Sequence, residues 1–146
     1  MKKFVFKLQR VLDYKGIREN EEKAEYGKAF IEYENEKTTL NKLKNDILNI
    51  MNEKDKEEKM TIDKLKYYGD YLKFLEQKIE FQEQKVENAR KYLEERRQKL
   101  VEISKEKKTF EKLKEKAKED YNKETIREDD AFNDQINAYN SSKGEE

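Results

Sequence analysis

A regular heptad pattern between Leu65 and Tyr121 constrains this chain more than any other feature. Reading alternately three and four residues along the stretch gives Leu65, Tyr68, Leu72, Leu75, Ile79, Gln82, Val86, Ala89, Leu93, Arg96, Leu100, Ile103, Lys107, Phe110, Lys114, Ala117 and Tyr121. Most of these residues are apolar, whereas the residues between them are mostly charged or amides. Such a narrow stripe fits one partner helix or at most two. A solvated single helix is the alternative, but it gives no reason to keep Leu and Ile in phase for so long.

The composition points to the same class. Charged residues make up 47% of the 146 residues and hydrophobic residues only 34%, which is too few apolar residues for a globular core. The chain has no Pro, Cys, Trp or His. Lys plus Arg and Asp plus Glu are equal in number, so no net field attracts nucleic acid or an anionic membrane. We therefore predict an all-α coiled coil and no nucleic-acid partner.

A second apolar pattern predicts the first helix, over about residues 4–51. Its clearest positions are Tyr26, Ala29, Tyr33, Leu40, Leu43, Ile47 and Ile50. A competing stripe of Ile17, Ala24 and Ile31 leaves the phase uncertain before Leu40, which suggests a phase shift or local looseness.

The charged stretch over about residues 52–61 predicts the turn, with Thr61 capping a second helix over about residues 62–138. A short break between two such patterns indicates a single antiparallel hairpin spanning residues 1–146. Folding about residue 56 sets Leu40 near Leu72 and Tyr33 near Ile79, so apolar meets apolar at these levels. The same register places Arg96 beside Gly16.

The two predicted helices differ in length. The first ends opposite about residue 108, so 20 to 30 residues of the second should extend alone and then fray over residues 139–146. The extension carries apolar residues without a partner in the hairpin: Phe110, Leu113, Ala117, Tyr121 and Ile126. A second protein is the best explanation for them.

Nothing in the sequence indicates an active site. It has no histidine, no cysteine and no glycine-rich phosphate loop, and carboxylates scattered along helices do not converge on a metal ion. We therefore expect no enzyme activity, no cofactor, no metal and no small-molecule substrate.

Aromatic residues on the second helix form a row that the seam cannot bury: Tyr67, Tyr71, Phe74 and Phe81. Exposed aromatics among lysines and glutamates are typical of a protein-docking surface. A third helix or a self-association face is the alternative.

The N-terminal block is a second candidate contact, because it combines apolar and basic residues: Phe4, Phe6, Leu8, Arg10, Val11 and Leu12. Leu8 and Leu12 could instead simply close the seam. An amphipathic membrane anchor is disfavoured by the short apolar face. With neither a membrane span nor a signal-peptide pattern, we expect a cytoplasmic protein.

The opening KKFVFKLQRVLDYKGIRENEEKAE and the later ARKYLEERRQKLVEISKEKKTFEKLKEKAKEDYNKE resemble the FliJ family of the flagellar type III export apparatus. The resemblance implies a non-enzymatic coiled coil similar to the central stalk of rotary ATPases. It further implies three partners: a hexameric flagellar export ATPase, the export gate membrane protein FlhA, and export chaperones. The expected location is the cytoplasmic face of the inner membrane at the flagellar base.

The resemblance also assigns roles to residues. The ATPase-ring contact would be formed by Phe4, Phe6, Leu8, Arg10, Val11, Phe110 and Leu113. The gate contact would be the aromatic row of Tyr67, Tyr71, Phe74 and Phe81. Two alternatives remain open, namely the equivalent stalk of a virulence secretion system and a structural coiled-coil scaffold.

Overall fold

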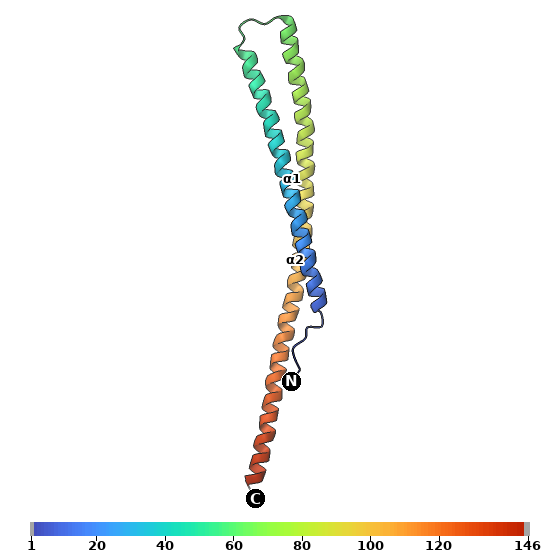
Figure 1. Ribbon diagram of the computed structural model, residues 1–146, viewed down its shortest axis with the longest axis vertical. Coiled ribbons are helices and arrows are strands. Elements are labelled where there is room, and N and C mark those ends of the chain that lie inside the picture. Colours follow the sequence, from blue (N-terminus) through green and yellow to red (C-terminus); the bar gives the residue numbers. More distant parts are fainter. Residues whose placement is uncertain (1, 145–146) are drawn as a thin grey trace. The chain divides into compact units, whose positions relative to one another are not determined.

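The computed structural model describes residues 2–144 and is all-α, as predicted. Helix α1 spans Gln9–Lys56 and helix α2 spans Ile62–Gly144, and residues 57–61 form the turn between them (Figure 1). The chain divides into two compact units. The first combines the residues up to Asn20 with those from Glu102 onward, and the second is Glu21–Val101. Both helices contribute to both units, so each unit contains a stretch of the coiled coil.

In the second unit, α1 and α2 meet along an unbroken heptad seam. Ala29 and Leu75 are the most deeply buried apolar side chains, at 2% and 4% exposed. The α2 positions predicted from Tyr68 to Leu100 are all buried or partly buried. Only the first predicted position, Leu65, is not, since its side chain is 49% exposed.

The phase of α1 is continuous, and the predicted phase shift or looseness is wrong. Ala24 and Ile31, which suggested a competing stripe, both face solvent. Glu22 and Glu36 occupy seam positions at heptad spacing from Ala29, and both are buried or partly buried. Because a heptad pattern is recognised by its apolar residues, these two glutamates interrupt the apolar pattern of α1 without changing the phase of the helix.

Polar contacts cross the seam at these two glutamates. The Gln82 side-chain amide, 5% exposed, donates a hydrogen bond of 2.9 Å to the Glu36 carbonyl and another to the Glu36 carboxylate. One heptad beyond Ala29, an Arg96 guanidinium nitrogen lies 3.6 Å from a Glu22 carboxylate oxygen. A polar group buried without such a partner costs about 1–3 kcal/mol, so these contacts favour a single alignment of the helices.

The predicted register is wrong by about one heptad. The structure sets Glu36 opposite Gln82 and pairs Arg96 with Glu22, whereas folding about residue 56 would bring Glu36 close to Glu76. The cause is the turn, since α1 continues to Lys56 rather than to about residue 51 and leaves only residues 57–61 to reverse the chain. A slip of one heptad still pairs apolar with apolar, so the apolar pattern could not distinguish the two registers.

Thr61 caps α2 as predicted. Its hydroxyl oxygen accepts a hydrogen bond of 3.2 Å from the Lys64 backbone N–H. Glu57 closes the turn from the α1 side, with a carboxylate oxygen 2.5 Å from the Lys64 ammonium and 3.4 Å from the Tyr68 hydroxyl. The hydrogen bond that Lys64 donates to Glu57 raises the pKa of Lys64, and burial raises the pKa of Tyr68. These contacts fix where the chain reverses.

In the first unit, α1 begins at Gln9 and not between Lys3 and Lys7 as predicted. Residues 2–8, which we call the N-terminal strap, are not helical in the structure. Within the strap Phe4 and Phe6 are partly buried, whereas Val5 is 77% exposed, which is the alternation of an extended chain. The alternating Phe-Val-Phe sequence therefore predicts extended backbone better than it predicts a first helical turn.

The strap corrects the expected length of the unpaired extension. Extended chain advances about 3.3 Å per residue against 1.5 Å for a helix, so the strap covers more of α2 than a helix of the same length would. Phe4 packs on Tyr121, with ring centroids 5.5 Å apart. Ala117 and Tyr121 were thus wrongly predicted to lack an intrachain partner. The partly buried α2 positions end at Thr125, and residues 126–144 are exposed.

Helix α2 also ends later than predicted, at Gly144 rather than at about residue 138. No helix-breaking residue precedes Gly144, and the Lys143 ammonium lies 5.6 Å from the Tyr139 ring centroid, a favourable pairing one turn apart. The predicted fraying over residues 139–144 is therefore not observed. Residues 145–146 of that predicted tail lie outside the described residues.

The register can be tested with cysteines, because the chain has none of its own. Ala29 lies one heptad from Glu36 and Ala89 one heptad from Gln82, so Ala29→Cys with Ala89→Cys should form an intramolecular disulfide under mild oxidation. Tyr33→Cys with Ile79→Cys, the pair expected from the register about residue 56, should remain largely reduced. Gel mobility with and without reductant measures both. Preferential cross-linking of the second pair would contradict the observed register.

Candidate partner-binding surfaces

The aromatic row on α2 is exposed, as predicted. Tyr67, Tyr71, Phe74 and Phe81 are 66%, 37%, 49% and 66% exposed. The Tyr67 and Tyr71 rings are stacked, with centroids 6.2 Å apart and planes 1° apart, and Phe74 follows at 6.3 Å from Tyr71. The rings thus contact each other along the helix and leave their outer faces to solvent.

Lysines extend this row. The Lys78 ammonium lies 5.0 Å from the Phe74 ring centroid, and the Lys85 ammonium lies 5.0 Å from that of Phe81. Such cation–π contacts hold long side chains against rings that would otherwise be fully solvated. The row therefore combines aromatic area with positive charge, which suits an interface with a protein surface that is apolar and acidic.

The N-terminal strap forms one wall of a groove in the first unit. The groove has a volume of about 1020 Å³, and its lining residues are 2–8 of the strap with Ala117, Asp120, Tyr121 and Glu124 of α2. The Tyr121 hydroxyl donates a hydrogen bond to the Lys2 carbonyl. One ring contact and one hydrogen bond thus hold the far end of the strap on α2.

The residues predicted for the ATPase-ring contact differ in their surroundings. Phe4, Phe6 and Leu8 line the strap groove. Val11 is 36% exposed and Leu113 is 44% exposed. Arg10 is also exposed, whereas Phe110 is a partly buried seam residue.

Sequence reasoning missed Ala117 and Tyr121 as members of the strap groove. The signal was the alternation of Phe4 and Phe6, which implies a strand-like segment needing an apolar surface. In the predicted hairpin the second helix was uncovered beyond about residue 108, and Ala117 and Tyr121 are seam positions in that stretch.

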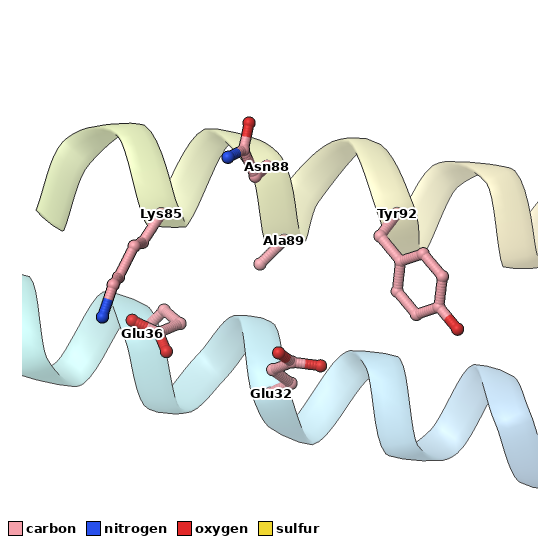
Figure 2. Close-up of a pocket in the computed structure, with 6 residues that line it drawn as sticks. All are labelled: Glu32, Glu36, Lys85, Asn88, Ala89 and Tyr92. Carbon is pink, nitrogen blue, oxygen red and sulfur yellow. The ribbon is translucent and has the colours of Figure 1, made fainter. Parts of the chain in front are cut away.

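A small polar pocket lies between the helices of the second unit (Figure 2). It has a volume of about 370 Å³ and is lined by Glu32, Glu36, Lys85, Asn88, Ala89 and Tyr92. Glu36 is already engaged by Gln82. Among residues 2–144 no group of acidic side chains has the arrangement of a metal site. The pocket offers no nucleophile paired with a base.

Ion pairs flank the seam on α2. Arg90 and Arg97 each make two hydrogen bonds, of 2.9 and 2.7 Å, to the carboxylates of Glu87 and Glu94 respectively. These hydrogen bonds lower the pKa of both glutamates and raise the pKa of both arginines. The carboxylates are therefore held ionised by neighbours on their own helix, which is a structural role.

Comparison with known proteins identifies the family. The model of the flagellar FliJ protein family matches residues 3–146, nearly the whole chain. The chain belongs to the FliJ family. No curated protein and no solved structure gives a significant match.

Membership confirms the resemblance inferred from the sequence. As a FliJ protein, the chain is a component of flagellar biogenesis and of flagellar protein export, in a family of non-catalytic components. None of the helical segments in residues 2–144 has the length and hydropathy needed to cross a membrane.

The strap contact of this FliJ protein can be tested at Tyr121. Tyr121→Ala removes the ring contact with Phe4 and the hydrogen bond to Lys2, so trypsin cleavage after Lys3 and Lys7 should become faster. Tyr139→Ala is the matched control, because Tyr139 lies on the same helix, is 64% exposed and does not contact the strap. Unchanged cleavage at these two lysines in Tyr121→Ala would contradict the docked strap.

Proposed function

We propose that this FliJ protein acts as the central stalk of a hexameric flagellar export ATPase, contacts the export gate protein FlhA and escorts export chaperones. The observation that carries the proposal is membership of the FliJ family over nearly the whole chain, joined to a two-helix coiled coil. The proposed mechanism is binding without catalysis. The stalk promotes assembly of the ATPase ring and couples ATP hydrolysis to export at the cytoplasmic face of the inner membrane.

The proposed ring contact is centred on the first unit. Phe4, Phe6 and Leu8 supply apolar groups at the strap groove, and Lys2, Lys3 and Lys7 supply positive charge beside them. The same partner could contact three further exposed residues, Arg10, Val11 and Leu113. Phe110 is a partly buried residue of the seam. A stalk inside a ring needs anchors of this kind, because mutual burial of apolar groups stabilises binding while charge orients the partner.

The proposed gate contact is the aromatic row of the second unit. Its exposed rings lie in sequence on one helix, and the hairpin buries none of the four fully. Since large aromatic side chains are the usual energetic anchors of protein interfaces, Phe74 and Phe81 should dominate this contact. The escort of chaperones rests on the family alone, and we assign no residues to it.

Ring binding predicts that the chain stimulates ATP hydrolysis and ring assembly by the cognate export ATPase. Phe4→Ala with Phe6→Ala should reduce the stimulation about tenfold, because both apolar anchors are lost. Ile17→Ala is the matched control, because Ile17 lies in the same unit, is 57% exposed and does not line the strap groove. ATPase rate and light scattering provide the two measurements. No stimulation by the wild type, together with a stable homodimer, would favour the scaffold.

Gate binding predicts a separate effect. Phe74→Ala with Phe81→Ala should weaken binding to the soluble domain of the cognate FlhA about tenfold or more, with helicity and melting temperature nearly unchanged. Phe30→Ala is the matched control, because Phe30 lies on α1 in the same unit and is 46% exposed. Isothermal titration calorimetry and circular dichroism measure the two properties. Equal losses in both variants would exclude the row as the specific contact.

A further inference from the structure

The exposed end of α2 carries an apolar stripe that neither the seam nor the strap covers. We call Phe132, Ile136 and Tyr139 the C-terminal stripe; they are 62%, 41% and 64% exposed. Every described residue from Ile126 onward is exposed, so the stripe receives no cover from the described chain. The C-terminal stripe contains none of the residues proposed for the ring and gate contacts. A test of this surface is therefore independent of the tests of those two contacts.

The stripe continues the α2 seam in phase. Steps of four, three and four residues lead from Tyr121 through Thr125 and Glu128 to Phe132, and the same steps lead on through Ile136 and Tyr139 to Lys143. This is an eleven-residue repeat, with 3.67 residues per turn, which replaces the seven-residue repeat of the preceding seam. The stripe therefore stays on one side of α2. A helix packed on it would run almost parallel to α2 or cross it in the right-handed sense, unlike the left-handed heptad seam.

The charge beside the stripe indicates the chemistry of the occupant. At the spacing of an α-helix, two carboxylates lie on the side of the stripe, Glu128 and Asp129, and one cation, Lys143, lies at its end; Asp130, Asp134 and Arg127 lie on the opposite side of α2. Neither Glu128 nor Asp129 makes an ion pair with another described residue. A second copy packed in parallel would set these carboxylates against their counterparts, which disfavours that arrangement.

We propose that the C-terminal stripe is the docking face for a basic amphipathic helix of a partner protein. The apolar face of that helix would cover Phe132, Ile136 and Tyr139, and its lysines or arginines would pair with the carboxylates beside them. From Glu128 to Lys143 the uncovered face is about 23 Å long at 1.5 Å per residue, so a helix of about 16 residues or more covers it.

The test uses the full chain and two blocked synthetic helices of about 20 residues. Both peptides carry leucines at four-three-four spacing; one has lysines at the other positions and the second has glutamates. The lysine peptide should bind at least tenfold more tightly than the glutamate peptide, measured by fluorescence anisotropy. Binding should weaken at high salt, where charges are screened over about 3 Å.

Matched variants separate the stripe from general charge attraction. Phe132→Ala with Ile136→Ala should weaken binding of the lysine peptide about tenfold. Ile126→Ala should change it less than about twofold, because Ile126 is 60% exposed on the same helix but points away from the stripe. Alanine favours helix, so circular dichroism should show helicity retained in both variants.

Two results would overturn the inference. One is equal affinity for the lysine and glutamate peptides, or an unchanged affinity in the Phe132→Ala, Ile136→Ala variant. The other is a homodimer in light scattering that this double variant abolishes, because the occupant of the stripe would then be a second copy of the chain.

Discussion

The contact of α1 with α2 along a single narrow seam is the constraint on which the rest of the structure depends. Leu12, Ala29 and Leu75 are the only buried apolar side chains among the described residues, and none of them is fully buried, so little apolar area is removed from water per residue. A seam this thin cannot tolerate misalignment of its polar members. The hydrogen bonds of Gln82 to Glu36 and the contact of Arg96 with Glu22 therefore carry specificity that a larger core would obtain from side-chain shape.

The same thinness leaves most of each helix free for partners. Residues outside the heptad positions do not pack between the helices and need only be compatible with a helix. Aromatic residues can therefore lie together on one side of α2, as Tyr67, Tyr71 and Phe74 do. The strap adds a different kind of surface, because it presents apolar side chains from a non-helical segment laid on a helix. The described residues thus present several distinct surfaces to solvent.

Periodicity predicted the fold class, the two helices, the Thr61 cap and nearly every α2 seam residue. Periodicity failed to distinguish two registers of α1 against α2, because a slip of one heptad still sets apolar residues opposite apolar residues. Only Glu22 and Glu36, through their polar contacts, distinguish the registers. Periodicity failed again at Phe4 and Phe6. Their spacing of two residues indicates extended chain, but the prediction extended the following helix back over them. The exposure of the aromatic row was predictable because the seam leaves its side of α2 uncovered. The strap groove was not, since it joins segments more than 100 residues apart in the chain.

The position of the turn has a consequence for how the chain folds. Contacts near it join residues close in sequence, such as Glu57 and Tyr68, which are 11 residues apart, whereas Glu36 and Gln82 are 46 apart and Lys2 and Tyr121 are 119 apart. The entropy lost on closing a loop rises with its length, but each contact made shortens the loop that the next one must close. Zippering from the turn therefore offers the least costly order of events. The segment synthesised first would then be the last to dock.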